Sequence, residues 1–235
     1  MRQAFIEARG PEGEAAYRQY LDMVAATSPR SKVAENARNA AYYYGLAQRG
    51  EPLPARAGNA LVEPLPSPYG HIAQRLHVQN ANNVLNEGGW PVLQNPKPAS
   101  FVENLAGNQM PVTVDTHNAR LWGMTDTKGR PVNKPAKTEY GFIERLQQEE
   151  ARKLGMTPAQ YQASAWIGGG EQTGLKSSAD PFLKVLEDRI RLTAAKTGES
   201  PQDVLHRFIM GQNAPGRRGP LLSVAPVPVD TNRRD

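Results

Sequence analysis

Lys97 and Asp115 are the two residues whose types and spacing best fit a chemical reaction. Lys97 lies between two prolines, and Asp115 stands where a helix N-cap carboxylate would face solvent or a ligand. A lysine amine is a nucleophile once it is uncharged, and a nearby carboxylate receives its proton or stabilises a cation. Burial would lower the pKa of the lysine toward a nucleophilic range. The structural alternative makes Asp115 a simple N-cap and Lys97 a solvated loop residue.

The phrase Val114-Asp115-Thr116-His117 resembles the helix-hairpin-helix DNA glycosylase superfamily, the class that includes endonuclease III. The resemblance implies that Asp115 is the catalytic aspartate, which stabilises a cationic sugar or orients a nucleophile. It also implies that Lys97, eighteen residues earlier, is the Schiff-base lysine of the bifunctional members and attacks the sugar C1′. His117 matches the family's histidine, which supports the helix rather than reacts, and it is a candidate for substrate binding. No cofactor and no metal are implied.

The resemblance also implies DNA as the partner. The family hairpin reads Leu-Pro-Gly-Val-Gly, and the aligned residues here are Pro-Val-Leu-Gln-Asn, which end at Asn95. Asparagine tolerates the left-handed backbone that one glycine supplies, so Asn95 is a candidate DNA contact; the other glycine is absent. Arg120 and Lys128 are expected near the DNA backbone.

Two longer segments, residues 28–40 and 154–166, resemble phage-encoded relatives of this superfamily, and the similar region spans about residues 15–170. Within it, Gln162 and Trp166 are four residues apart on one helical face, where they would hydrogen-bond and stack a flipped base. The alternative is a core tryptophan whose indole is satisfied by a neighbour. Tyr44, the last of three consecutive tyrosines, is a further candidate for substrate binding.

Composition excludes several classes of protein. The 235 residues include no cysteine, which removes thiolate catalysis, disulfides and cysteine-bound metal clusters. A net charge of +5 favours polyanionic partners, and no apolar stretch is long enough to span a membrane. The N-terminus lacks a secretion signal, so we expect a location in the cytoplasm of a bacterial host cell, with virion association as an alternative. There is no phosphate-binding glycine loop, and His71 and His77 lack a third metal ligand.

Helical spacing and frequent helix starts predict an all-α fold, with a helix-hairpin-helix glycosylase-like arrangement. Proline follows a candidate N-cap residue at Ser28, Thr157, Asp180 and Ser200. We expect a helical core over residues 1–170, a C-terminal helical extension over 171–212, and an extended Pro/Arg-rich tail over 213–235. The two helices of the extension either pack on the core or form an oligomer interface. The tail is suited to docking on phage proteins.

These features together predict a DNA glycosylase-type enzyme that cleaves or exchanges a nucleobase–sugar bond, with Schiff-base lyase activity as an added possibility. One alternative is a phage structural or DNA-organising protein that keeps the fold and has lost catalysis. Another is an enzyme that modifies a thymine-derived base and leaves it in DNA. The sequence does not separate repair from modification.

Overall fold

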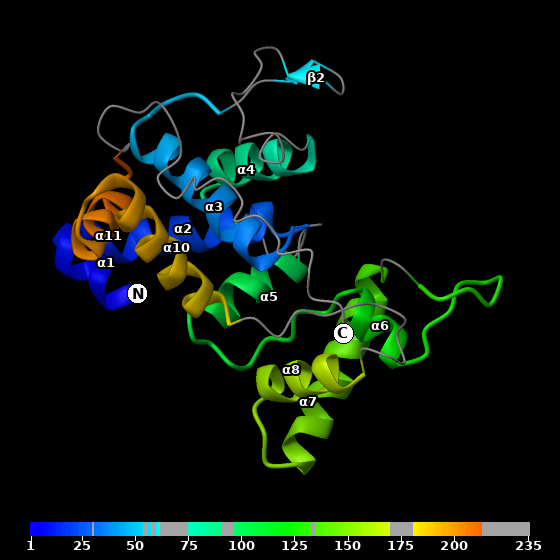
Figure 1. Cartoon of the computed structure of the whole chain (residues 1–235). Coiled ribbons are helices and arrows are strands. Elements are labelled where there is room, and N and C mark those ends of the chain that lie inside the picture. The colour runs from blue at the N-terminus through cyan, green and yellow to red at the C-terminus, as the bar shows by residue number, and fades with distance from the viewer. Residues whose placement is uncertain are drawn as a thin grey trace, which may run out of the picture. The chain divides into compact units, whose positions relative to one another are not determined.

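A computed structural model describes residues 1–29, 31–53, 56–57, 60–61, 75–90, 96–132, 135–169 and 181–212. These residues are mainly α-helical, which confirms the all-α class (Figure 1). None of the described helices is both long and apolar enough to cross a membrane. The elements in chain order are α1 (Arg2–Arg9), the 3-10 helix η1 (Gly10–Glu12), α2 (Gly13–Thr27), α3 (Val33–Gln48), the antiparallel strands β1 (Arg56–Ala57) and β2 (Ala60–Leu61), α4 (Arg75–Glu87), α5 (Pro96–Leu105), α6 (Thr116–Leu121), α7 (Lys137–Lys153), α8 (Pro158–Gly168), α10 (Phe182–Thr197) and α11 (Pro201–Ile209).

Two of the four predicted helix starts are confirmed. Thr157 and Ser200 each accept a hydrogen bond from the backbone N–H three residues later, at 3.3 and 3.1 Å, and a proline follows each of them. The start at Ser28 is wrong, because this residue directly follows α2 and the next helix begins only at Val33. Asp180 lies outside the described residues.

The sequence predicts a helix over residues 138–154 that is stopped by Gly155 and uses Ile143, Leu146, Ala151 and Leu154 as its apolar face. The structure has α7 there, and Gly155 follows its C-cap with a left-handed φ of 66°. Ile143 and Ala151 are buried as predicted, whereas Leu154 is 64% exposed. The buried face also includes Tyr140 and the polar Gln147. Polar residues therefore belong to the interior at this helix.

The chain divides into two compact units. Unit 1 comprises Met1–Asn86 with Asp180–Asp235, and unit 2 comprises Glu87–Ala179. This division differs from the predicted core over residues 1–170, because α10 packs against α3 and α11 against α1. The predicted tail, residues 213–235, lies outside the described residues.

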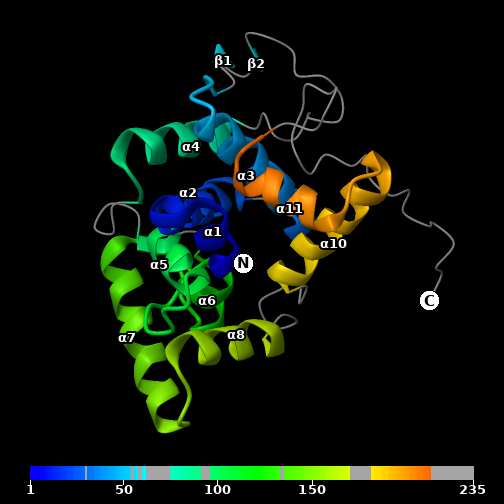
Figure 2. The ribbon, with the colours of Figure 1, turned by 90° about the vertical axis from the view of Figure 1, so that its left-hand side faces the viewer.

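Unit 1 is built on an aromatic core that joins its N-terminal and C-terminal helices (Figure 2). The rings of Phe5, Tyr20, Tyr44 and Phe208 lie with centroids between 4.9 and 6.1 Å apart. All four side chains are fully buried. The C-terminal helices therefore pack on the other helices of unit 1. Packing was one of the two arrangements that we expected for them.

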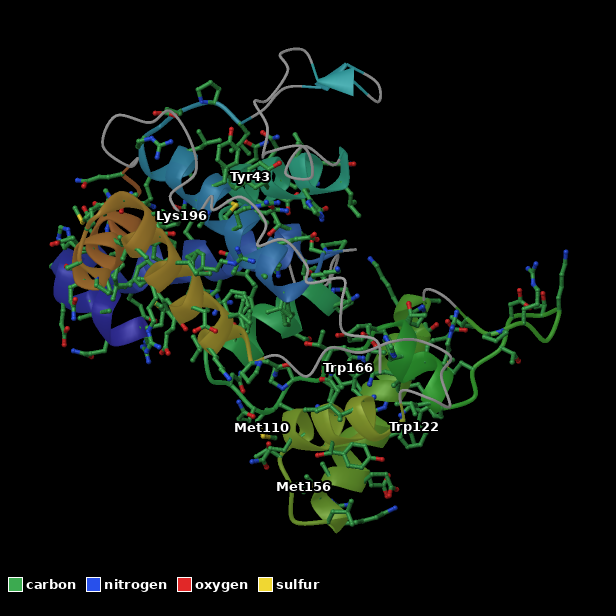
Figure 3. All side chains as sticks on the ribbon, viewed as in Figure 1. Tyr43, Met110, Trp122, Met156, Trp166 and Lys196 are labelled. Carbon is green, nitrogen blue, oxygen red and sulfur yellow. The ribbon has the colours of Figure 1, made fainter. Side chains whose placement is uncertain are left out.

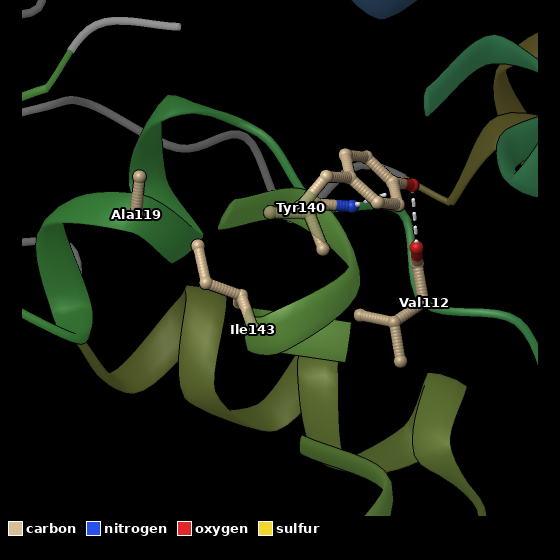
Figure 4. Close-up of a cluster of buried hydrophobic side chains, with 5 residues drawn as sticks. Val112, Ala119, Tyr140 and Ile143 are labelled. Atoms are coloured by element: carbon tan, nitrogen blue, oxygen red, sulfur yellow. Dashed lines mark hydrogen bonds between the residues drawn. The ribbon is translucent and has the colours of Figure 1, made fainter. Parts of the chain in front are cut away.

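Unit 2 has its own small apolar cluster (Figure 4). Val112 and Val114 come from the segment before α6, and Ala119, Tyr140 and Ile143 come from α6 and α7. Trp122, Met124 and Val132 are partly buried against these residues. This cluster packs the segment that ends at Asp115 against α7.

Candidate functional site

A single glutamine pairs with both backbone groups of Thr113, just before the candidate aspartate. Gln162 on α8 accepts a hydrogen bond from the Thr113 N–H at 2.9 Å through Oε1. Its Nε2 donates to the Thr113 carbonyl at 2.8 Å. Thr113 is buried, so Gln162 replaces the partners that a neighbouring β-strand would supply. Both ends of the amide that we assigned to a flipped base are thus engaged within the protein, and the structure gives Gln162 a positioning role instead.

Two side chains of α7 hold the residues on either side of Thr113. The Tyr140 hydroxyl donates to the Val112 carbonyl at 2.7 Å and accepts from the Val114 N–H at 3.2 Å (Figure 4). Burial raises the pKa of Tyr140 to about 12, so its hydroxyl remains a donor at neutral pH. Glu144, one turn further along, accepts from the Val112 N–H at 3.1 Å. We call residues 112–114 the braced segment, because side chains rather than a strand satisfy its backbone.

Helix α5 contacts the braced segment through two side chains. Asn104 accepts from the Thr113 hydroxyl at 2.9 Å. One turn earlier, the Ser100 hydroxyl lies 3.3 Å from the Tyr140 hydroxyl, which bonds both Val112 and Val114. Side-chain hydrogen bonds therefore join α5 to the braced segment.

Lys97 lies on the same face of α5 as Ser100 and Asn104, three and seven residues before them. Lys97 thus belongs to the helix that contacts the braced segment, and Asp115 directly follows that segment. Lys97 is exposed, so the burial that we expected around its amine is absent in the structure.

Asp115 is the N-cap of α6, as the structural alternative predicts. Its Oδ1 accepts from the Asn118 N–H at 3.0 Å, and its own N–H donates to the Asn118 side chain at 3.1 Å. Asp115 is only partly buried. An ionised carboxylate has about four acceptor positions, so the cap leaves most of its capacity for other groups.

His117 and Trp166 form a pair in the same unit. Their rings meet edge to face with centroids 5.6 Å apart, and both side chains are partly buried. The Trp166 Nε1 is buried and has no hydrogen-bond partner among the described residues. Figure 3 shows Trp166 at α8. Among the described residues, the indole therefore lacks the neighbour that the alternative interpretation requires.

Tyr44 does not line a substrate site, which corrects our prediction. It lies in unit 1, is fully buried, and donates a hydrogen bond to the Ile209 carbonyl at 2.6 Å. Burial raises the pKa of its hydroxyl to about 12. Its neighbour Tyr43 is also fully buried. Both rings pack the interior of unit 1 because their helix α3 is covered on that face.

The three candidate DNA contacts have different outcomes. Arg120 lies in the last turn of α6 and is partly buried. Lys128 is exposed on the loop that follows α6. Asn95 lies outside the described residues, as does the rest of the hairpin-like sequence, residues 91–95. The helix-hairpin-helix element itself stays a prediction.

The bracing side chains were missed from the sequence. Ser100 and Asn104 are four residues apart, as are Tyr140 and Glu144. Such spacing puts each pair on one helical face, where an apolar stripe would be expected. The spacing of these polar residues was visible in the sequence. Most of their partners are backbone groups, and a backbone group cannot be recognised from the type of residue that carries it.

The comparisons with known proteins leave the activity open. No curated protein and no solved structure matches this chain. One family model matches residues 4–172, which include all but the first two residues of α1 and all elements from η1 to α8. The chain therefore belongs to the family described as "Family of unknown function (DUF7178)".

Proposed function

We propose that this protein is a DNA glycosylase-type enzyme that cleaves or exchanges the bond between a nucleobase and its sugar. The observation that supports the proposal is that α5 is hydrogen-bonded to the braced segment, through Asn104 to Thr113 and through Ser100 to Tyr140. Helix α5 carries Lys97 and the braced segment leads into Asp115, and these are the two residues that the glycosylase resemblance assigns to catalysis.

In the proposed reaction, the Asp115 carboxylate takes up the ammonium proton of Lys97. The amine nitrogen then bonds to C1′ while the bond from C1′ to the base breaks, and the base leaves with the proton that Asp115 held. Asp115, ionised again, stabilises the cationic adduct and carries a proton from its nitrogen to the ring oxygen, so the sugar ring opens and leaves a protonated imine between Lys97 and C1′. Lys97 is exposed in the free protein. In this proposal the bound DNA therefore has to exclude water from the Lys97 amine.

The edge-to-face pair of His117 and Trp166 supports a place for the extruded base. Trp166 presents a partly exposed ring and a buried indole N–H without a partner among the described residues. An extruded base offers both a stacking face and hydrogen-bond acceptors. In this proposal Gln162 does not contact the base; it positions the site by holding the backbone of Thr113.

The test is borohydride trapping on duplex DNA that contains one abasic site. The native chain should give a covalent adduct, because borohydride reduces the imine to a stable amine. Lys97→Ala should lose the adduct. The matched control is Lys153→Ala, which removes an exposed lysine from the far end of α7 and should keep it. Loss of the adduct in both variants would contradict the assignment of Lys97.

Asp115→Asn separates catalysis from folding, because asparagine is as good an N-cap as aspartate. The variant should fold normally and release less base from DNA, as measured by mass spectrometry of the free bases. If the native chain gives neither an adduct nor a released base, two alternatives replace the proposal. Altered nucleosides in digested DNA would favour a thymine-modifying enzyme, and DNA binding without any chemistry would favour a DNA-organising phage protein.

A further inference from the structure

The loop between α6 and α7 is fixed by one carboxylate. Asp126 accepts hydrogen bonds from the backbone N–H groups of Lys128 and Arg130 at 2.8 and 3.0 Å. It also accepts from the Arg130 guanidinium at 2.9 and 2.7 Å, and this side-chain bond is the main reason that the pKa of Asp126 is lowered. Thr125 and Pro131 close the base of the loop as an antiparallel bridge. The loop extends away from α6 with a defined shape (Figure 1).

An open hollow of about 850 Å³ lies at the base of this loop. Its lining mixes polar and apolar groups, and no described lining residue is aromatic. The polar lining residues include Arg120, Thr125, Asp126, Arg130 and Glu139. A hollow without an aromatic ring offers no surface on which a base would stack.

The charge around the hollow is positive. In the lining itself, Arg120 and Arg130 balance Asp126 and Glu139, so the positive charge comes from residues beside the hollow. Lys128 at the loop and Lys137 at the start of α7 are exposed. The N-terminus of the 17-residue helix α7 adds a partial positive charge at the same place.

We infer that this hollow and its loop bind the sugar–phosphate backbone of DNA next to the nucleotide that reacts. The inference rests on the proposed function for the identity of that nucleotide. Cations without aromatic rings suit phosphates rather than bases. Arg120 is five residues after Asp115 along α6, about 7.5 Å at 1.5 Å per residue. This distance is about two base steps of 3.4 Å, so the phosphates are those within about two nucleotides of the one that reacts.

The salt dependence of DNA binding tests this inference. The double variant Lys128→Ala/Lys137→Ala removes two exposed charges beside the hollow. The matched control, Arg152→Ala/Lys153→Ala, removes two exposed charges from the other end of α7, about 22 to 24 Å away along the helix axis. Binding of the full chain to a fluorescent duplex is measured by anisotropy over a range of salt concentrations, with two duplexes of different sequence.

Each phosphate contact contributes about 0.9 to the slope of log K against log salt concentration. The hollow variant should therefore lower the magnitude of the slope by about two on both duplexes, and the control should leave it unchanged. Equal slopes for the two double variants would overturn the inference, and so would an effect confined to one DNA sequence. A slope change without trapped adduct or released base keeps the DNA surface and removes the proposed function. A trapped adduct or released base together with an unchanged slope would keep the proposed function and remove the DNA surface.

Discussion

Replacing Gln162 with alanine should destabilise unit 2 by several kcal/mol. The substitution removes both hydrogen bonds to Thr113, at 2.9 and 2.8 Å, and Thr113 is only 9% exposed. Each buried backbone group left without a partner costs about 1–3 kcal/mol, so the expected loss is about 2–6 kcal/mol. The value falls toward the lower end if a water molecule enters the space left by the side chain.

Tryptophan fluorescence measures this loss selectively, because all three tryptophans, Trp90, Trp122 and Trp166, lie in unit 2. Urea unfolding followed by fluorescence should shift to lower concentration in Gln162→Ala. The control is Gln160→Ala on the same helix, where an exposed glutamine completes only the capping box and should cost about 1 kcal/mol or less. If both variants unfold at the same urea concentration, the bracing role of Gln162 is refuted.

Three further outcomes follow from individual contacts. Asp115→Ala should lower the free energy of unfolding by about 1 kcal/mol in the same fluorescence assay, and Asp115→Asn should leave it unchanged, since only alanine loses the cap to Asn118. Tyr44→Phe removes the hydrogen bond to the Ile209 carbonyl, so thermal unfolding followed by circular dichroism should show a loss of about 1 kcal/mol, with trapping yield on abasic DNA retained. Burial lowers the pKa of His77 below about 6.5, so the unfolded chain takes up the proton first as the pH falls. Stability should therefore decrease below about pH 6.5, and urea unfolding at several pH values should show a smaller decrease for His77→Gln.

The fold class could be predicted from local signals because helix caps and helix ends are encoded by adjacent residues. Thr157 and Gln160 are three residues apart, and Gly155 directly follows Leu154, the C-cap of α7. The prediction at Ser28 was wrong for the same reason, since a serine before a proline has the same local pattern at the end of one helix as at the start of the next. The partnership of α10 and α11 with the N-terminal helices could not be predicted, because it depends on contacts between residues about 200 positions apart, such as Phe5 and Phe208.

The candidate site was predictable in its residues and not in their roles. The chemical type of Gln162 indicated a hydrogen-bonding residue, and the structure shows that its partner is the Thr113 backbone. Tyr44 belongs to a run of three tyrosines, and one sequence cannot tell which side of a helix is covered by another helix. The exposure of Lys97 depends in the same way on what surrounds α5.

The cap formed by Asp115 does not by itself decide between a structural and a chemical role, since one carboxylate oxygen bonds Asn118 and the other retains acceptor capacity. The bracing bears on the position of Asp115. The backbone groups of the buried residues 112–114 need hydrogen-bond partners, and side chains of α7 and α8 supply them. Hydrogen bonds fix direction as well as distance, whereas apolar contacts tolerate sliding. Asp115 therefore follows a segment of defined geometry, which serves the N-cap of α6 and is also what the proposed reaction requires.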